Sequence, residues 1–260
     1  MYLGIDVGSV STDAVLLGQE GEVKAYCIVK SGFDHKTAIE SAMNKVCCEA
    51  GIACSEIKGI VGTGYGRRNV PGACKTVTEI SCHAMGIHSI FPQVRTVIDI
   101  GGQDSKAICV SEEGFVETFV MNDKCAAGTG RFLEVMANAM GVEIFELGAL
   151  ALAAKKVEPI SSICTVFAES EVISKIAEGC SREAIVSGIH HAIGERLMGM
   201  AASIGVKKPI ALTGGVAKNS GVVKALSKHL GNDLLIPDDP QIVGALGAAI
   251  YAKNYVKEGL

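Results

Sequence analysis

A strand–turn–strand pattern occurs twice in this chain and limits the folds that it can adopt. Residues 2–17, YLGIDVGSVSTDAVLL, contain an apolar strand that carries Asp6 near its end, a glycine-serine turn and a second apolar strand. Residues 96–110, TVIDIGGQDSKAICV, repeat this order, with Asp99 in the place of Asp6. Apolar runs bounded by glycine turns are typical of β-strands. The repeat therefore predicts a duplicated α/β unit.

Helical patterns surround the two strand units and suggest a division of the chain. They are expected at about residues 36–50, 77–91, 130–140, 165–178 and 182–204, followed by a strand PIALTGG, a further helix and a terminal helix QIVGALGAAIYAKNYV. The small residues of the terminal helix predict that it packs closely against a sheet. We place the boundary where the second copy begins. Domain I then comprises residues 1–95 plus the C-terminal helix 241–260, and domain II comprises residues 96–240.

The charge and hydropathy pattern excludes two classes of partner. The formal net charge is −4 and the chain contains no basic run, so it offers no electrostatic surface for nucleic acid or for an anionic membrane. No apolar stretch approaches the roughly 18–20 residues that span a bilayer. The first residues, MYLGIDVGS, lack the pattern of a signal peptide. We therefore expect a cytoplasmic protein.

The glycine turns in the two copies predict phosphate binding. Glycine lets backbone N–H groups approach phosphate oxygens without a side chain in the way. A carboxylate at the end of each first strand can hold Mg²⁺, usually through water. Asp6 and Asp99 would then face each other across a cleft, with the turns GSVS (8–11) and GGQD (101–104) holding the phosphates. Either turn alone is equally compatible with an ordinary β-turn.

Together with LTGGVAKNSG (212–221), these turns stand in the order of the phosphate-1, phosphate-2 and adenosine motifs of actin, sugar kinases and heat-shock chaperone ATPases. The resemblance implies an α/β, two-domain actin/sugar kinase/heat-shock ATPase fold, built from duplicated ribonuclease-H-like units with ATP between them. The terminal helix would return to the first domain. Gln103 and Asp104, directly after the phosphate-2 turn, are candidates to orient the attacking water. The expected nucleotide contacts are Gly8, Ser9, Ser11, Thr12, Gly101, Gly102, Gly214, Gly215, Lys218, Asn219 and Gln241.

Two of the ten cysteines stand in similar surroundings. The segments NDKCAAGTGRF and SSICTVFAESEVIS each place one cysteine, Cys125 or Cys164, just ahead of a helical pattern, where a helix N-terminus stabilises a thiolate. An iron–sulfur cubane takes four thiolates, and a twofold dimer supplies every residue twice. Two cysteines per chain is thus the number that one shared cluster requires. The other cysteines, with no C-x-x-C among them, are expected to be structural.

With these motifs, the sequence closely resembles the ATP-dependent activators of 2-hydroxyacyl-CoA dehydratases, a family that also covers benzoyl-CoA reductase ATPase subunits (BadF/BadG/BcrA/BcrD type). The resemblance rests on GIDVGS, TGYGR, SCHAMG, VIDIGGQD, NDKCAAGTGRF, CTVFAESEVIS, TGGVA and GALGAA. It implies that Cys125 and Cys164 ligate one oxygen-sensitive [4Fe-4S] cluster per homodimer, beside ATP or ADP and Mg²⁺. Reduced ferredoxin or flavodoxin would be the donor. A 2-hydroxyacyl-CoA dehydratase, or a related double-cluster or benzoyl-CoA reductase-type enzyme, would be the acceptor.

Two other functions fit the phosphate motifs. A small-molecule kinase of the same fold would use Asp99 or Asp104 as the base for a substrate hydroxyl, but it leaves Cys125 and Cys164 unexplained. A non-redox ATPase switch would bind a protein partner as chaperone ATPases do, although the chain has no extra substrate-binding domain. Iron and sulfide content separates both alternatives from the activator.

Overall fold

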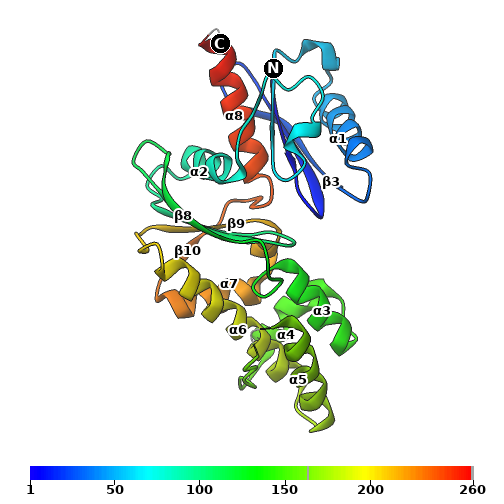
Figure 1. Cartoon of the computed structure of the whole chain (residues 1–260), viewed down its shortest axis with the longest axis vertical. Coiled ribbons are helices and arrows are strands. Elements are labelled where there is room, and N and C mark those ends of the chain that lie inside the picture. The colour runs from blue at the N-terminus through cyan, green and yellow to red at the C-terminus, as the bar shows by residue number, and fades with distance from the viewer. Residues whose placement is uncertain (163, 259–260) are drawn as a thin grey trace. The chain divides into compact units, whose positions relative to one another are not determined.

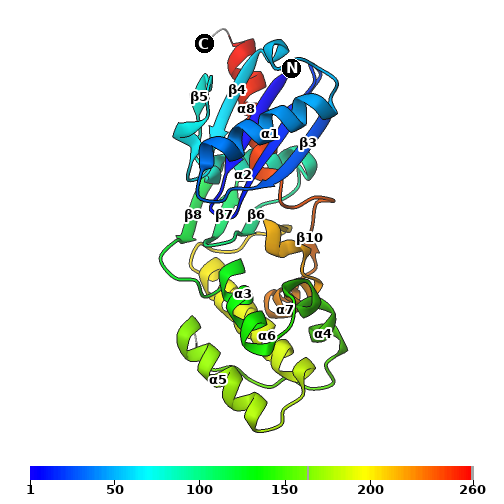
Figure 2. The same cartoon turned by 90° about the vertical axis from the view of Figure 1, so that its right-hand side faces the viewer.

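The computed structural model describes residues 1–162 and 164–258 (Figures 1 and 2). The chain divides into two compact units. The first comprises Met1–Val94, Val110–Glu117 and Pro237–Leu260, and the second comprises Arg95–Cys109 and Thr118–Ile236.

The first unit is built on a mixed sheet with the strand order β3-β2-β1-β4-β5. Its strands are β1 (Tyr2–Val7), β2 (Ser11–Leu17), β3 (Val23–Lys30), β4 (Gly59–Thr63) and β5 (Lys75–Thr76). Its helices are α1 (His35–Glu49), α2 (Glu79–Ile90) and α8 (Val243–Lys257), with 3-10 turns η1 (Cys54–Glu56) and η2 (Arg67–Asn69). Strand β1 runs antiparallel to β2 and parallel to β4.

Successive side chains of β1 point to opposite faces of the sheet, and both faces are buried. Leu3 and Ile5 belong to the core under α1, whereas Tyr2 belongs to the core under α8. Figure 2 shows α1 on one side of the sheet and α8 on the other. The close approach of α8 depends on Gly4, because a Cβ at this position would collide with the backbone of Ala245. The terminal helix therefore packs tightly on the sheet, as its small residues predict.

Helices α2 and α8 lie side by side (Figure 1) and meet through a glycine. A Cβ at Gly247 of α8 would collide with the backbone carbonyl of Cys82 on α2. We expect Gly247→Ala to lower the free energy of unfolding by about 1–3 kcal/mol through overpacking, although alanine favours helix by about 1 kcal/mol.

The matched control for this substitution is Gly199→Ala. Gly199 also lies inside a helix, but nothing stands within 4 Å of a Cβ built on it. Thermal unfolding should show a lowered midpoint for Gly247→Ala and an unchanged or raised midpoint for Gly199→Ala. Equal shifts in the two variants would contradict the packing argument.

The second unit repeats the strand order of the first, as β8-β7-β6-β9-β10. Its strands are β6 (Thr96–Ile100), β7 (Ser105–Val110), β8 (Val116–Asn122), β9 (Ile210–Thr213) and β10 (Leu234–Leu235). Its helices are α3 (Gly130–Met140), α4 (Leu147–Ala153), α5 (Thr165–Ala177), α6 (Arg182–Ala202) and α7 (Ser220–Leu230), with 3-10 turns η3 (Ile144–Glu146) and η4 (Gly215–Lys218). The β6–β7 pair is antiparallel and the β6–β9 pair parallel, as in the first unit. The predicted duplication is confirmed.

One core connects the sheet of the second unit to its helices. Ile98 and Ile100 of β6 and Leu212 of β9 pack with apolar residues of α3, α6 and α7.

Within the described residues no single helix is both long and apolar enough to cross a membrane. Two consecutive helical segments, Gly130–Met140 and Ile144–Ala153, together have the length and apolar composition of a membrane span. The chain bends by 100° at the break between them.

Candidate functional site

The two predicted metal-binding aspartates occupy equivalent places in the two units. Asp6 of β1 lies beside Thr63 on the parallel strand β4. Asp99 of β6 lies beside Thr213 on the parallel strand β9. Each unit therefore brings one aspartate and one threonine together at the same point of its sheet.

A glycine in a left-handed conformation follows each threonine. Gly64 has φ +81° and Gly214 has φ +86°, values that L side chains rarely adopt. A Cβ at Gly64 would collide with the Asp6 carboxylate, and a Cβ at Gly214 would approach the Asp99 carboxylate to 2.8 Å. The TG pairs of TGYG and TGGV thus keep the space around each aspartate open.

The phosphate-1 turn leaves backbone donors available. The Gly8 N–H donates to the Ser11 carbonyl over 2.9 Å, and the Ser31 hydroxyl donates to the Gly8 carbonyl over 2.7 Å. Among the described residues, no acceptor takes a hydrogen bond from the backbone N–H of Ser9 or Val10. Turn N–H groups of this kind form an anion-binding concavity.

Polar side chains line the strands next to this turn. The Gln241 amide donates to the Ser11 hydroxyl over 3.0 Å, and that hydroxyl donates to Asp13 over 3.1 Å. Asp13 is directly opposite Asp6 in the β1–β2 pair. Carboxylate oxygens are among the ligands that Mg²⁺ takes in proteins. Thr12, a predicted contact, is buried and hydrogen-bonds to Ser31.

The phosphate-2 turn has the same available donors and contacts a helix. Its ends are joined by the Gly101 N–H, which donates to the Asp104 carbonyl over 2.9 Å. No acceptor among the described residues takes a hydrogen bond from the backbone N–H of Gly102 or Gln103.

The carbonyls of this turn accept the first N–H groups of α3. Gly101 O accepts from Gly130 N over 2.9 Å, and Gly102 O accepts from Arg131 N over 2.8 Å. A Cβ at Gly130 would lie 3.3 Å from both Gly101 O and the Gly102 Cα. The turn is therefore fixed to the start of the helix that follows the Cys125 segment.

A buried lysine joins the two aspartates predicted at this turn. Lys106 Nζ lies 3.1 Å from Asp99 Oδ2 and 2.9 Å from Asp104 Oδ2, and all three residues are at most 5% exposed. The Thr213 hydroxyl donates to Asp99 Oδ1 over 2.9 Å. Two carboxylates share one ammonium, so this group keeps a formal charge of −1 within the fold.

The adenosine motif begins at Gly214 and continues through η4, which carries Gly215 and Lys218, to Asn219. Asn219 Oδ1 accepts the N–H groups of Gly221 and Val222 and so caps α7. His190 of α6 approaches the same oxygen with its Nε2 at 3.1 Å. Burial lowers the pKa of His190, although its two hydrogen bonds oppose the shift.

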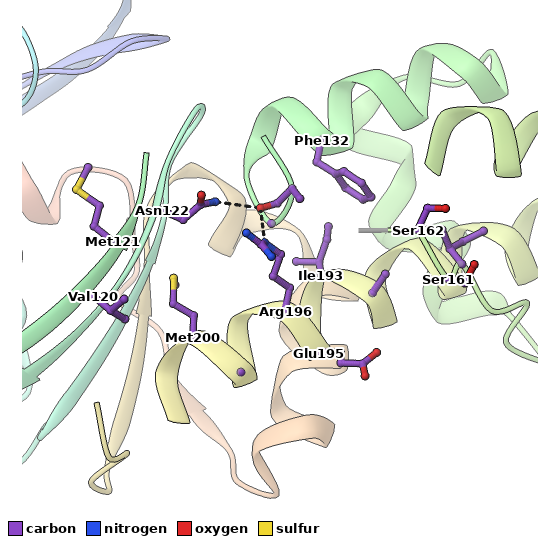
Figure 3. Close-up of a pocket in the computed structure, with 15 residues that line it drawn as sticks. Val120, Met121, Asn122, Phe132, Ser161, Ser162, Ile193, Glu195, Arg196 and Met200 are labelled. Atoms are coloured by element: carbon purple, nitrogen blue, oxygen red, sulfur yellow. Dashed lines mark hydrogen bonds between the residues drawn. The ribbon is translucent and has the colours of Figure 1, made fainter. Parts of the chain in front are cut away.

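The Cys125 segment is held from two sides. Asn122 at the end of β8 donates its amide to the carbonyls of Cys125 (2.8 Å) and Ala127 (3.1 Å). Arg196 Nε of α6 donates to the same Ala127 carbonyl over 3.1 Å. Figure 3 shows both side chains directed at this carbonyl. The Cys125 side chain is half-buried.

The Cys164 segment is held by a carboxylate. Cys164 is exposed and is the N-cap residue of α5. Glu171, two turns further along α5, accepts the N–H groups of Ser161 (3.0 Å) and Ser162 (3.0 Å). Burial alone would raise the pKa of Glu171, but these hydrogen bonds outweigh it and hold the pKa below its ordinary value. Within the described part of the chain, the buried hydroxyl of Thr165, next to Cys164, has no hydrogen-bond partner.

Both cysteine segments border one cavity of about 600 Å³ in the second unit (Figure 3). Asn122, Ala127 and Gly128 line it from the Cys125 side, and Ser161 and Ser162 from the Cys164 side. Within the described part of the chain, no three His, Cys, Asp or Glu side chains come together to hold a metal. The two segments thus contribute one half-buried and one exposed cysteine, and thiolates are the ligands that iron–sulfur clusters take.

Lys106, Asn122 and Arg196 are among the residues of these sites that were not predicted. Lys106 could have been found, because a tight hairpin through GGQD pairs it with Asp99. Asn122 stands inside the quoted cysteine motif. Arg196 carried no sequence signal, since it lies on a helix far along the chain.

Several characterised proteins are similar to this chain over nearly its whole length. The activator of lactoyl-CoA dehydratase from Anaerotignum propionicum is 48% identical over 253 residues, which cover 97% of each protein. The structure of the activator of the 2-hydroxyisocaproyl-CoA dehydratase from Clostridium difficile with bound ADPNP is 44% identical and superposes with a TM-score of 0.95, covering 100% of this chain and 97% of that one.

A more distant structure supports the fold alone. A ROK family glucokinase from Streptomyces griseus is 15% identical, with a TM-score of 0.58, and covers 97% of this chain and 99% of its own. The two repeated sheets and this likeness give the predicted actin/sugar kinase/heat-shock ATPase fold. The profile of the BadF/BadG/BcrA/BcrD ATPase family matches residues 3–252. The chain therefore belongs to the BadF/BadG/BcrA/BcrD ATPase family.

Proposed function

We propose that this protein is an ATP-dependent activator of a 2-hydroxyacyl-CoA dehydratase or a related enzyme. It would act as a homodimer that shares one [4Fe-4S] cluster and receives electrons from reduced ferredoxin or flavodoxin. The observation that carries the proposal is the pair of cysteine segments on one cavity, in a unit that also holds the predicted phosphate-2 turn. The similar activators named above support the choice of partner.

Each step of ATP binding and hydrolysis has residues assigned to it. The free N–H groups of Ser9, Val10, Gly102 and Gln103 would bind phosphate oxygens. Asp6 and Asp99 would hold Mg²⁺, largely through water, and Gln103 and Asp104 would orient the attacking water. The Lys106 ammonium forms an ion pair with Asp99 and with Asp104 and so holds the two side chains close to each other. Adenosine contacts are expected around Gly214 and Gly215, and Lys218, Asn219 and Gln241 are further predicted contacts with the nucleotide.

Cys125 and Cys164 of each chain would supply the four thiolates, and a bound cluster would supply a one-electron carrier. Helix α5, which starts directly after Cys164, presents an exposed apolar face formed by Val166, Phe167, Ile173 and Ile176. Patches of this kind mark protein interfaces. Continuity between this face and Cys164 supports a second copy of the chain as its partner.

Two connections lead from the nucleotide motifs to the Cys125 segment. The phosphate-2 turn accepts hydrogen bonds from the start of α3, five residues after Cys125. Helix α6 contacts the adenosine motif through His190 and the Cys125 segment through Arg196. A nucleotide-dependent shift of either motif would therefore reach Cys125 through rigid elements.

Magnitudes limit what this coupling does. A coupling free energy of about 1–3 kcal/mol changes a one-electron reduction potential by roughly 45–130 mV. This follows because a tenfold change in the equilibrium constant corresponds to about 59 mV for one electron. Coupling of this size cannot by itself drive electrons onto a very difficult acceptor. ATP hydrolysis would therefore act mainly as a gate that makes transfer to the partner effectively irreversible.

The test combines composition, nucleotide binding and activity. Protein purified without oxygen should contain about four iron and four sulfide per dimer, bind Mg-ATP by calorimetry, and activate a 2-hydroxyacyl-CoA dehydratase only when ATP and a reductant are present. ATP binding without iron would favour the kinase or the non-redox switch. No ATP binding by the intact dimer would refute all three functions.

Arg196 provides a further prediction, because it holds the Ala127 carbonyl of the Cys125 segment. Arg196→Met should accelerate iron loss under a chelator several-fold and change the electron paramagnetic resonance spectrum of the reduced protein. Arg196→Lys should restore part of both, and calorimetry should show unchanged ATP binding. Arg182→Met, at the exposed start of α6, is the control. Identical iron loss in the Arg196→Met and Arg182→Met variants would contradict the assignment.

A further inference from the structure

Two thiols in the first unit lie closer together than non-bonded sulfur atoms normally do. Cys54 Sγ is 2.6 Å from Cys47 Sγ. A disulfide bond is about 2.0 Å long, so the two sulfurs need only a small movement to bond. Neither residue belongs to the turns assigned to nucleotide or to the segments assigned to the cluster.

The end of α1 brings these thiols together. After the C-cap Ala50, Gly51 adopts a left-handed conformation with φ +67°. The Gly51 N–H donates to the Cys48 carbonyl over 3.1 Å, and the Ile52 N–H donates to the Cys47 carbonyl over 3.0 Å. This is the Schellman pattern of helix ends. It turns the chain back along α1, so that η1 returns to the last turns of the helix.

Cys54 is then fixed at the start of η1. The Glu56 carboxylate accepts the Ala53 N–H over 2.9 Å and holds the 3-10 turn. Cys54 Sγ also lies 3.9 Å from the carbonyl oxygen of Met43, one helical turn before Cys47. Because both sulfurs are positioned by backbone hydrogen bonds, oxidation would not require the helix to unfold.

We propose that Cys47 and Cys54 form a reversible disulfide by exchange with a low-molecular-weight disulfide such as oxidised glutathione. The Cys54 thiolate attacks one sulfur of that disulfide and releases one thiolate, which leaves a mixed disulfide on Cys54. The Cys47 thiol then loses its proton and attacks Cys54 Sγ, releasing the second thiolate. The protein loses two electrons and two protons, and the small disulfide becomes two thiols.

Exposure sets this order of attack. Cys54 is exposed, whereas Cys47 is 3% exposed, so only Cys54 is open to a small disulfide. Burial, together with the neighbouring Cys54 thiol, raises the pKa of Cys47 to about 12. Cys47 therefore stays protonated while Cys54 reacts, and acts only as the second sulfur.

Cys48 is the natural control, because it follows Cys47 directly and is exposed. Adjacent residues of a helix point about 100° apart, so Cys48 does not share the position of Cys47 beside Cys54. The disulfide should therefore form between Cys54 and the buried Cys47, and not between Cys54 and the exposed Cys48. A disulfide driven by exposure alone would select Cys48.

The experiment equilibrates the intact protein, prepared without oxygen, in mixtures of reduced and oxidised glutathione. Free thiols are then alkylated under acid quench, and the chain is cut after Lys45, Glu49 and Glu56, which separates Cys47 and Cys48 from Cys54. Mass spectrometry should find the 46–49 and 50–56 peptides joined at high oxidised glutathione, and separate after dithiothreitol. Cys48→Ser should leave this linkage in place, and Cys54→Ser should abolish it.

Two results would overturn the proposal. One is complete alkylation of Cys54 in wild type at the most oxidising mixture. The other is loss of the linkage in Cys48→Ser, which would place the bond at Cys48. Because neither Cys54→Ser nor Cys48→Ser changes a buried residue, both variants should fold, and every outcome can be interpreted.

Discussion

Cys125→Ser or Cys164→Ser should each abolish stable binding of iron and sulfide. One cubane needs four thiolates, and a twofold dimer that draws two from each chain loses two of them with either substitution. We expect wild-type protein to carry about four iron per dimer and each variant to retain little. Transfer of electrons to the partner should be lost, while ATP binding measured by calorimetry should persist.

Cys48→Ser is the matched control for Cys164→Ser, because both thiols are exposed. It should leave iron and sulfide at the wild-type level. Air should remove iron from the wild type, since a cluster at a subunit interface has no protein shell of its own. Full iron and unchanged activity in either Cys125→Ser or Cys164→Ser would make the shared site wrong and would favour a kinase.

The repeated elements could be predicted from the sequence, because their signals are local. Asp6 and Asp99 each end an apolar strand before a glycine turn, and the structure places them beside Thr63 and Thr213 in the same topology. The helices expected at 36–50 and 165–178 end within one residue of α1 and α5. Short α4 was not predicted, because seven residues carry little periodicity.

The supports of the cluster segments could not be predicted, because they depend on contacts between distant positions. Arg196 reaches Ala127 across 69 positions of sequence, and His190 reaches Asn219 across 29. A helical pattern shows that α6 is buried but not which of its polar residues meets which loop. These long-range pairs are the part of the site that only the folded chain reveals.

The second large effect is expected at Lys106. Lys106→Met removes the ammonium that pairs with both Asp99 and Asp104, two carboxylates that are at most 5% exposed. Breaking a buried ion pair by removing one partner costs about 3–5 kcal/mol. We therefore expect urea unfolding, followed without oxygen, to show a free energy of unfolding lower by about this amount.

Lys124→Met is the matched control, because Lys124 also pairs with a carboxylate, Asp123, at 3.0 Å, but its side chain is 88% exposed. Exposed pairs contribute about 0–1 kcal/mol, so this variant should unfold almost as the wild type does. The difference between the two lysines isolates burial, since the charge removed and the residue introduced are the same. If both variants were equally stable, Lys106 would not neutralise the phosphate-2 aspartates, and the assignment of Asp99 to the metal and Asp104 to the attacking water would lose its electrostatic support.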